Sequence, residues 1–445
     1  MPPGRCHTQP AAPQLLRQRQ VDTSLTATQQ PHSRVMTTIA YSTSPFFLGD
    51  DKTAILRSVA PMTPSSAAPS PSAVAVGLAY WATAAPNRIA AADIHRSVCF
   101  EEIEAVAATL ATTLAASAPQ GSTDEQSWLP VITDRSVTAS MALHGAIRAG
   151  RCFVPIESST PRDRVADFFA RLGHPQQAVV TRPEYAALLP HGVEAIAVPQ
   201  PSSDRIDPVA IDSSMPGFVV FTSGSTGRPK AVLRRWSSCE RRSNAHLTDG
   251  VPAVGDEWRT TVLQPFSFSP GLRSSCGLAL GRSIHIADPA SMSVDALLTW
   301  LDGQHIDELN LSATLAATFL AASNGGRRLP SVTQLRLGSE ASSWELVAPL
   351  RRLTSPDVII VTGYGASESG QLFNYVVGPD HPVGQGRIPI GTPNEAWRAR
   401  LVPVDGDETV TQLVLGSPEA LSYLDDPELT ARRFLTDADG TRWWV

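Results

Sequence analysis

Hydrophobic positions along the chain alternate between two spacings from about residue 78 onward. In "CFEEIEAVAATLATTLAAS", apolar residues recur every three or four positions from Ile103 to Leu114, the spacing of a half-buried helix. "WLPVITD" and "FVVF" are short unbroken apolar runs, which are typical of buried strands. Helix and strand patterns in alternation predict an α/β fold.

The same alternation continues through the middle of the chain. Helical spacing recurs in "SVTASMALHGAIRAG", "PRDRVADFFARLG", "SVDALLTWLDGQ" and "LSATLAATFLAAS". Gly150 and Gly173 follow the first two of these segments, where a glycine commonly ends a helix. Strand patterns occur in "RCFVPIE", "QAVVT", "AIAV", "QLRLGS" and "DVIIVTGYG". From about Ile388, β-type runs dominate ("ARLVPV", "TQLVLG"), with one helix predicted at "DPELTARRF".

The first 77 residues have a different composition from the rest. "MPPGRCHTQPAAPQLLRQRQ" contains no acidic residue and no apolar segment of the signal-peptide type. We interpret residues 1–35 as disordered, or as an over-extended start with translation from Met36, and a transit-like presequence is the alternative. Residues 36–77 are predicted to be loosely structured around a Pro/Ser/Ala linker from Ala60 to Ala73. The predicted domain occupies residues 78–445.

Composition and charge narrow the functional classes. The net charge of -6 disfavours a nucleic-acid partner, which needs a basic face. The sequence contains no run of about 18 apolar residues, so it does not predict a membrane-spanning helix. The five cysteines are scattered without a C-x-x-C pair, which argues against a zinc site or a disulfide framework and favours a reducing, cytoplasmic location.

The segment "FVVFTSGSTGRPKAVLRRW" carries the clearest chemical signal. A strand is followed by a loop rich in hydroxyl groups and flexible backbone amides, and such a loop can wrap an anion. Its candidate phosphate-binding residues are Thr222, Ser223, Gly224, Ser225, Thr226, Gly227 and Lys230. The P-loop of nucleotide triphosphatases is excluded, because it requires a lysine directly after the last glycine. Taken alone, the loop is also compatible with an ordinary Ser/Gly-rich surface loop.

Six segments in order resemble the adenylate-forming enzymes, the superfamily of acyl-CoA synthetases, nonribosomal peptide synthetase adenylation domains and luciferases. "TSGSTGRPKAV" resembles their phosphate loop, and "VTGYGASESG" resembles their Tyr-Gly-x-Thr-Glu motif with Ser367 in the Thr position. "IRAGRCFVPIESSTPRDR", "GSEASS", "IPIGTP" and "TQLVLGSPEALSYLDDPELTARRF" resemble further family segments. The resemblance extends from about Leu78 to Val445.

The resemblance implies a fold, cofactors and residue roles. The implied fold is the large N-terminal domain of these enzymes, with two βαβ-type subdomains and a distorted β-barrel. The implied cofactors are ATP and Mg²⁺, with coenzyme A or phosphopantetheine as acyl acceptor and a carrier protein as a potential partner. The loop from Thr222 to Lys230 would hold the β- and γ-phosphates of ATP.

The remaining roles fall on two short segments. Glu368 would be a Mg²⁺ ligand and Ser367 would bind the α-phosphate, as the catalytic pair. Tyr364 would stack on adenine, Gly365 would allow the close approach, and Gly338, Ser339 and Glu340 would lie beside the base. In isolation, a Tyr-Gly pair is usually a turn and a lone glutamate is usually solvated.

The resemblance places the acyl substrate at "LQPFSFSPG", with Phe266, Phe268, Ser269 and Gly271 as substrate-binding residues. Synthetases of α-amino acids usually carry an aspartate where this chain has Ser269. Because an ammonium group would lose its partner there, we expect an aryl, fatty or hydroxy acid. The alternative for Phe266 and Phe268 is that they are core aromatics.

The chain departs from the family pattern after the phosphate loop. Trp236 stands where many relatives carry a histidine. The cluster Arg234, Arg235, Arg241 and Arg242 is compatible with binding a phosphate of coenzyme A or an acidic carrier protein, and also with a solvated face. His144 and His246 have no metal-ligand spacing, and we expect structural roles for them.

The family's ribose-binding aspartate and its small C-terminal domain, with a catalytic lysine, are absent from this sequence. We therefore expect a fragment or a truncated chain with impaired activity. The predicted reaction is ATP-dependent activation of a small carboxylic acid to an acyl-adenylate, followed in a full-length parent by transfer to a thiol. The alternative is a non-catalytic nucleotide-binding remnant.

Overall fold

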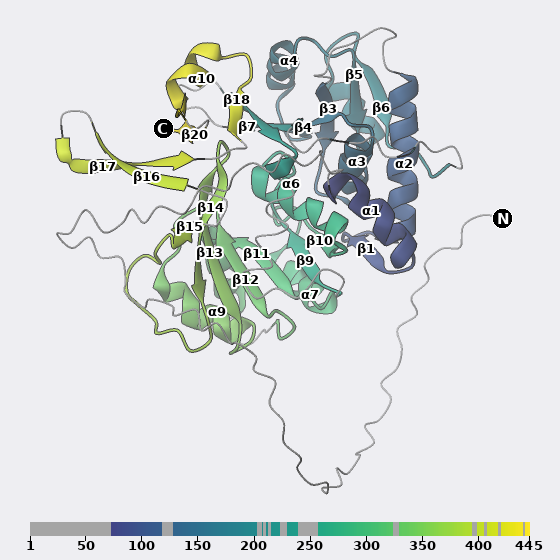
Figure 1. Cartoon of the computed structure of the whole chain (residues 1–445). Coiled ribbons are helices and arrows are strands. Elements are labelled where there is room, and N and C mark those ends of the chain that lie inside the picture. The colour runs from purple at the N-terminus through teal and green to yellow at the C-terminus, as the bar shows by residue number, and fades with distance from the viewer. Residues whose placement is uncertain are drawn as a thin grey trace, which may run out of the picture. The chain divides into compact units, whose positions relative to one another are not determined.

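The computed structural model describes residues 73–117, 128–202, 207, 211, 215–222, 229–238, 257–323, 329–393, 398–404, 407–416, 420–438 and 441–445. Within these ranges, the helices and strands are organised on three sheets (Figure 1). Several predicted features lie outside the described residues: the lead-in before Ala73, the loop residues Ser223, Gly224, Ser225, Thr226 and Gly227, and the residues Arg241, Arg242 and His246.

A seven-stranded sheet has the order β18-β8-β7-β4-β3-β5-β6 in the described part of the chain. Strands β3 to β7 run parallel to one another, whereas β8 pairs antiparallel with β7 and β18 pairs antiparallel with β8 at one edge. The bounds are β3 (Trp128–Thr133), β4 (Cys152–Glu157), β5 (Gln177–Val180), β6 (Glu194–Ala197), β7 (Pro216–Thr222), β8 (Lys230–Arg235) and β18 (Ala420–Tyr423).

A second sheet contains nine described strands in the order β15-β14-β13-β12-β11-β9-β10-β1-β2. Its centre, from β13 to β1, is parallel, and antiparallel strands close both edges. The bounds are β1 (Ile89–Ala92), β2 (Ser97–Cys99), β9 (Arg259–Val262), β10 (Ser283–Ile286), β11 (Glu308–Ser312), β12 (Gln334–Gly338), β13 (Ile359–Ala366), β14 (Gly370–Val377) and β15 (Thr392–Pro393).

The predicted β-rich C-terminal part is an antiparallel sheet in the order β16-β17-β20-β19. Its described strands are β16 (Arg398–Val404), β17 (Asp407–Gly416), β19 (Phe434–Thr436) and β20 (Arg442–Trp444). Helix α10 (Pro427–Arg433) precedes β19, and the side chain of Asp426 caps it by accepting a hydrogen bond from the Leu429 amide at 2.9 Å.

Most of the other helices follow parallel strands, whereas α1 precedes β1 and α2 follows the antiparallel strand β2. Their bounds are α1 (Ala73–Ala84), α2 (Phe100–Ala116), α3 (Val137–Arg148), α4 (Arg162–Arg171), α6 (Ser269–Ser275), α7 (Val294–Gly303), α8 (Ala313–Ser323) and α9 (Val347–Leu353), with short 3₁₀ helices η1 (Pro183–Leu188), η2 (Cys276–Leu280) and η3 (Trp344–Leu346). Ser136 and Ser293 cap α3 and α7 through their side-chain oxygens, which satisfy amides that a helix start leaves unpaired. None of the described helices combines the length and the apolar character that crossing a bilayer requires.

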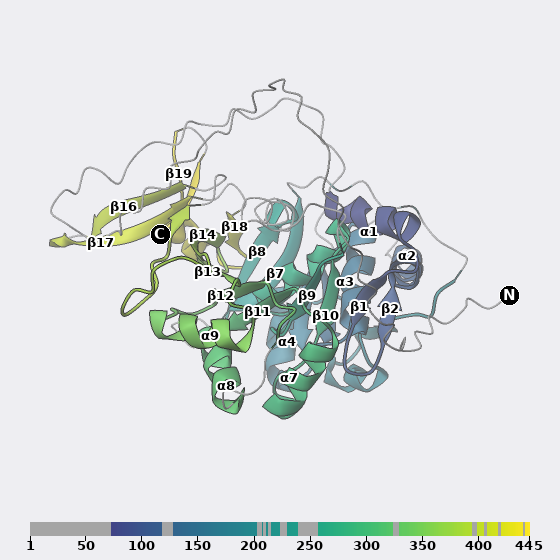
Figure 2. The ribbon, with the colours of Figure 1, turned by 90° about the horizontal axis from the view of Figure 1, so that it is seen from below.

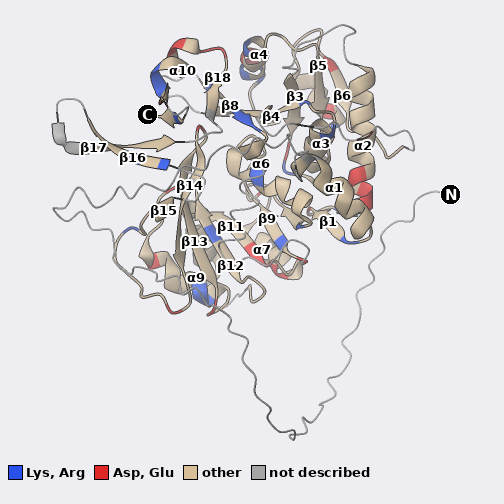
Figure 3. Cartoon of the chain, in the orientation of Figure 1, with Lys and Arg blue, Asp and Glu red and all other residues tan. Residues whose placement is uncertain are grey.

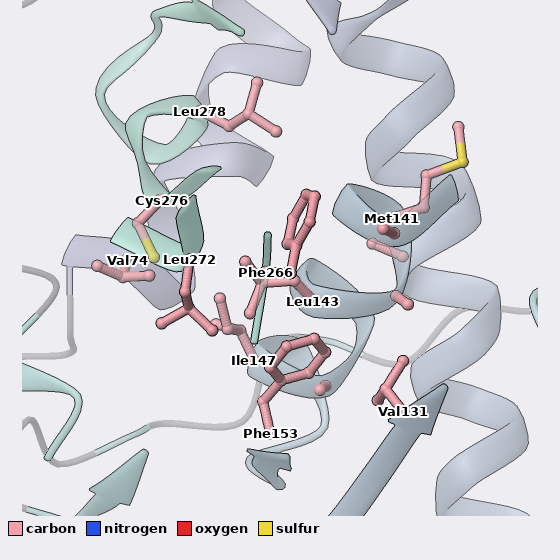
Figure 4. Packing of buried hydrophobic residues seen from close by; sticks show 14 of the residues in the cluster. Val74, Val131, Met141, Leu143, Ile147, Phe153, Phe266, Leu272, Cys276 and Leu278 are labelled. Atoms are coloured by element: carbon pink, nitrogen blue, oxygen red, sulfur yellow. The ribbon is translucent and has the colours of Figure 1, made fainter. Parts of the chain in front are cut away.

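Two large apolar clusters hold the sheets in place. One packs α1, α2 and α3 against strands of both sheets, with Phe153, Phe218 and Phe266 fully buried in it (Figure 4). The other lies under α7, α8 and α9, which follow one another along one face of the nine-stranded sheet (Figure 2). Burial of apolar area at about 25 cal/mol per Å² makes such clusters the main stabilising contribution.

The predicted alternation of helices and strands is confirmed, with two local corrections. Helix α1 begins at Ala73, so the loosely structured lead-in predicted to reach residue 77 ends earlier. Its buried residues Val74, Leu78 and Trp81 pack in the first cluster, and this tertiary contact is not visible in local spacing. The segment predicted as one helix from Leu311 is a strand end followed by α8, since β11 pairs with β12 up to Ser312.

Candidate functional site

The two ends of the predicted phosphate loop lie opposite each other on an antiparallel pair of strands. Thr222 ends β7 and is directly paired with Lys230, the first residue of β8. The guanidinium of Arg171 donates a hydrogen bond to the Pro229 carbonyl and lies 5.7 Å from the centre of the Phe221 ring. The loop therefore leaves and re-enters the sheet at one point, which positions Thr222 and Lys230 together.

Ser367 and Glu368 lie in the tight turn between β13 and β14. The Ser369 amide donates to the Ala366 carbonyl at 3.2 Å, and Gly370 adopts φ +81°, a left-handed value that favours glycine. Glu368 is only 8% exposed, and its Oε1 accepts a hydrogen bond from the Tyr423 hydroxyl at 3.0 Å. The turn thus presents a largely buried, oriented carboxylate.

Tyr423 also connects this carboxylate to the phosphate loop. The ammonium nitrogen of Lys230 lies 5.4 Å from the centre of the Tyr423 ring, within the range of a cation–π contact. Lys230 and Glu368 are far apart in sequence, yet both contact the same side chain. Tyr423 was not among the residues predicted from the sequence, since nothing in its local context indicates a contact with Glu368.

The predicted adenine segments lie side by side at one edge of the nine-stranded sheet. Strands β12 and β13 are parallel, with Leu337 opposite Thr362, so the residues that end them meet at the same edge. Tyr364 is 41% exposed and its ring packs edge-on against Phe373, with 6.0 Å between ring centres. An exposed ring supported from behind is available for stacking on a base.

Gly338 ends β12, and Ser339 and Glu340 follow it directly. The Glu340 carboxylate accepts hydrogen bonds from the Thr314 amide at 2.6 Å and from the Thr314 hydroxyl at 2.9 Å. The hydrogen bond from the Thr314 amide is the main cause of the lowered pKa of Glu340. Its side chain therefore caps the start of α8. Ser339 has φ +71°, an uncommon conformation for a residue other than glycine.

The geometry of the β13–β14 hairpin explains why residue 365 is a glycine. A Cβ added at Gly365 would lie 1.8 Å from the Gly370 carbonyl oxygen across the turn. The absence of a side chain is therefore required for the turn to close, independently of any ligand.

The predicted acyl-binding segment, Leu263 to Gly271, follows β9 and continues into α6. Its side chains differ in how far they are buried. Phe266 is fully buried in the first cluster (Figure 4), which supports the core alternative for this residue. Phe268 is 37% exposed, whereas Ser269 is buried and its hydroxyl has no hydrogen-bond partner among the described residues. At Gly271, a Cβ would lie 2.2 Å from the Pro265 carbonyl oxygen, so this glycine is required by the fold of the segment.

Glu157, which the sequence interpretation did not select, lies next to the acyl segment. It ends β4, and its Oε1 accepts a hydrogen bond from the Ser267 amide at 3.4 Å. Burial raises the pKa of Glu157, and the nearby Arg135 opposes this effect. Arg135 in turn forms an ion pair with Asp288, which follows β10, so the strand ends of the two sheets are joined here as well.

One of the four arginines in the predicted cluster, Arg234, does not lie on a solvated face. Arg234 is only 3% exposed, and its Nη1 donates to the Ser367 carbonyl at 2.7 Å. Trp236 is 1% exposed and packs on Phe218, so it fills the core instead of a ligand site. Lys and Arg residues colour parts of β8 blue in Figure 3, and two of them contact other parts of the candidate site: Lys230 contacts Tyr423, and Arg234 contacts the Ser367 carbonyl.

A metal ion at this site would have few protein ligands. The described residues contain no group of three or more His, Cys, Asp and Glu that could hold one. Mg²⁺ is usually bound by one or two carboxylates together with substrate phosphates and water. Glu368 beside the phosphate loop fits that pattern, because its Oε2 receives no hydrogen bond from the described residues.

Comparison with known proteins decides the family. Residues 78–417 match the model of the AMP-binding enzyme family, which covers most of the chain. The chain belongs to this family. The order of the sequence motifs within residues 78–417 thus reflects common descent.

The similar curated proteins include peptide synthetases of much greater length. The chain is 27% identical over 368 residues to a probable nonribosomal peptide synthetase, CymA of Salinispora arenicola, and 29% identical over 374 residues to the antimetabolite synthetase AmbB of Pseudomonas aeruginosa. These alignments cover 80% and 79% of this chain. The chain spans 4% of the length of CymA and 28% of the length of AmbB.

Solved structures show the same fold at low identity. The peptide synthetase FmoA3 superposes with a TM-score of 0.74 at 19% identity, covering 84% of this chain and 40% of that one. The N-terminal subdomain of Klebsiella oxytoca NpsA, in complex with 3-hydroxybenzoyl-AMSN, gives a TM-score of 0.68 at 20% identity and covers 83% and 94%. The architecture is thus that of the large N-terminal subdomain of adenylation domains.

Proposed function

We propose that this chain binds ATP with Mg²⁺ and activates a small carboxylic acid as its acyl-adenylate. A carboxylate oxygen of the acid attacks the α-phosphorus of ATP, the bond to the bridging oxygen of the β-phosphate breaks, and pyrophosphate leaves. The observation that carries the proposal is the convergence of Lys230 and Glu368 on Tyr423, in a chain of the AMP-binding enzyme family. Because the substrate carboxylate is itself the nucleophile, catalysis rests on positioning and on electrostatic stabilisation.

Each predicted residue has a proposed task in that reaction. Thr222, Lys230 and the loop between them bind the β- and γ-phosphates, and the turn residue Ser367 binds the α-phosphate. A bound Mg²⁺ would neutralise phosphate charge, with Glu368 as its protein ligand. Exposed Tyr364 stacks on adenine, and the backbone of Gly338 to Glu340 contacts the edge of the base.

We further propose that the acid lacks an α-ammonium group. Ser269 is neutral and buried, so it offers no counter-charge. The nearest carboxylate to the acyl segment, Glu157, already accepts the Ser267 amide, and burial favours its uncharged form. The shared fold does not choose the acid, because NpsA was solved with 3-hydroxybenzoyl-AMSN and FmoA3 with α-methyl-L-serine-AMP, so both kinds of acid belong in the test.

The experiment is ATP–pyrophosphate exchange with a panel of benzoic, hydroxybenzoic, fatty, hydroxy and α-amino acids. We expect exchange above the acid-free background with at least one acid that lacks an α-amino group, and loss of that exchange in Lys230→Ala. ATP binding without exchange for any acid would support the nucleotide-binding remnant instead. Exchange confined to α-amino acids would overturn the assignment of Ser269.

The acyl acceptor is proposed to be a thiol, which attacks the acyl carbonyl carbon and releases AMP. Coenzyme A and a carrier-bound phosphopantetheine present the same thiol. Thioester formation in parallel reactions with coenzyme A and with a phosphopantetheinylated carrier protein distinguishes them.

A further inference from the structure

Two strands of the seven-stranded sheet contact the turn that carries Ser367 and Glu368. Strands β8 and β18 are antiparallel neighbours, with Tyr423 opposite Val232 and Ala420 opposite Arg234. The turn belongs to the nine-stranded sheet. Arg234 and Tyr423 therefore join the two sheets at the residues proposed to bind the α-phosphate and the metal.

Arg234 holds the backbone of the turn. Its Nη1 donates to the Ser367 carbonyl at 2.7 Å, while its Nε and Nη2 donate to the Ser238 hydroxyl at 3.1 and 2.9 Å. A Cβ at Gly370 would lie 2.9 Å from Nη2, so the turn fits closely around the guanidinium. Burying a charged guanidinium is costly unless it is hydrogen-bonded, and here those bonds fix the turn.

Tyr423 holds the carboxylate of the turn, and the direction of each hydrogen bond is determined. Trp444 Nε1 lies 3.0 Å from the Tyr423 hydroxyl, and an indole nitrogen can only donate. The hydroxyl oxygen therefore accepts from Trp444, and its hydrogen is left to donate to Glu368.

We propose that Arg234 and Tyr423 are positioning residues for adenylation: Arg234 fixes the Ser367 carbonyl, and Tyr423 orients the Glu368 carboxylate beside Lys230. Neither group contacts the reacting atoms in this assignment. With one carboxylate oxygen held by Tyr423, the other is left for the metal. The proposal rests on the proposed function, because it presupposes that Glu368 binds Mg²⁺ with ATP.

A purely structural cross-link and a positioning contact make different predictions for Tyr423→Phe. The variant retains the ring that Lys230 and Phe434 contact and removes only the hydroxyl. A positioning role predicts that affinity for ATP with Mg²⁺ falls about tenfold, since a hydrogen bond to a charged group of this kind is lost, while affinity for ATP in EDTA is unchanged. A merely structural role predicts a lower melting temperature with the same ratio of the two affinities.

The experiment is calorimetric ATP binding with Mg²⁺ and with EDTA for the wild-type chain, Tyr423→Phe and a control, Tyr185→Phe. Tyr185 also donates to a carboxylate, Asp134, at 3.2 Å, but away from the turn. We expect the Mg²⁺-dependent gain to fall in Tyr423→Phe alone. If the wild type shows a gain and Tyr423→Phe retains it, the positioning role is overturned and the proposed function stands. If the wild type shows no gain, the proposed function fails and this inference fails with it.

A measurement on the wild type covers the case in which Tyr423→Phe does not fold. Hydrogen exchange is followed in peptides that contain the turn and in peptides that contain β18, with and without ATP and Mg²⁺. Coupled positioning predicts that the ligand slows exchange in both segments. Protection of the turn without protection of β18 would overturn the proposal.

Discussion

The ammonium nitrogen of Lys230 lies 5.4 Å from the centre of the Tyr423 ring, and the hydroxyl of that ring donates to Glu368 at 3.0 Å. One aromatic side chain thus separates a cation proposed for the terminal phosphates from a carboxylate proposed for Mg²⁺. This arrangement keeps the two opposite charges close without pairing them. Both remain available to a ligand that carries phosphates and a metal.

Replacing Lys230 by Ala should weaken ATP binding more than AMP binding. Lys230 borders the loop assigned to the β- and γ-phosphates, which AMP lacks. A charge-assisted hydrogen bond of this type contributes about 1.5–3 kcal/mol. Calorimetry with both nucleotides measures the difference, and equal losses for ATP and AMP would contradict the assignment.

Replacing Glu368 by Gln should leave the chain folded and abolish the dependence of ATP binding on Mg²⁺. The amide keeps the shape of the side chain and an oxygen that accepts from Tyr423, but it lacks the negative charge that attracts a hard cation. Titration of ATP at increasing Mg²⁺ concentration tests this expectation. A variant with wild-type Mg²⁺ dependence would exclude Glu368 from the metal site.

Gly365→Ala should destabilise the hairpin of β13 and β14, and the equivalent change at Gly338 should not. A methyl group at Gly365 would meet the Gly370 carbonyl, whereas nothing lies within 4 Å of a Cβ at Gly338. The overpacking is expected to cost about 1–3 kcal/mol of unfolding free energy. Urea denaturation of the two variants measures it, and a stable Gly365→Ala with intact ATP binding would refute the steric explanation.

Glu308→Gln should be among the most destabilising single changes in the nine-stranded sheet. The Glu308 carboxylate is buried between Arg282 at 3.5 Å and Arg336 at 3.4 Å, and these two charges lower its pKa against the opposing effect of burial. Removing the negative charge that is buried beside both cations is expected to cost about 3–5 kcal/mol. The control is Glu257→Gln, whose exposed ion pair with Arg259 contributes about 0–1 kcal/mol. Similar losses in the two variants would show that the buried pair is not special.

Stability should fall as the pH is lowered from 7 to 5, because of two buried histidines. Burial lowers the pKa of His144 and of His285 from 6.5 to about 4. Between these values the unfolded chain binds protons that the folded chain does not, so stability is complete above pH 6.5 and decreases as the pH falls toward 4. The loss at pH 5 is on the order of 2 kcal/mol for each histidine.

The check is denaturant unfolding at pH 7 and pH 5 for the wild type, His144→Gln and the exposed-residue control His191→Gln. Glutamine retains a donor for the Ser275 carbonyl, which lies 3.3 Å from His144 Nε2. His144→Gln should have a weaker pH dependence than the control. An unchanged slope would mean that His144 has the same pKa in the folded and the unfolded chain, which would contradict the effect of burial.

The sequence by itself determined the local and the inherited features of this protein. Helical spacing predicted α2, α3, α4 and α7, because apolar residues every three or four positions can only bury one face as a helix. Ordered motifs identified the family and the segments that carry Lys230, Tyr364 and Glu368, because those motifs are contiguous in the chain. The positions of individual strands were also predictable from the sequence, since short apolar runs mark them.

Only the tertiary structure decided which of these residues meet and which are hidden. Phe266 and Trp236 became core residues because α3, β4 and β7 close over them, and their own neighbours in sequence gave no sign of this. In the sequence, Arg234 is one of four arginines in a polar stretch. Only the tertiary structure shows that the turn at Ser367 packs against it. Tyr423 contacts Glu368 from 55 positions away, through a hydrogen bond between two sheets. Such contacts depend on how separate strands are brought together, and a linear pattern records spacing along the chain but not distance across it.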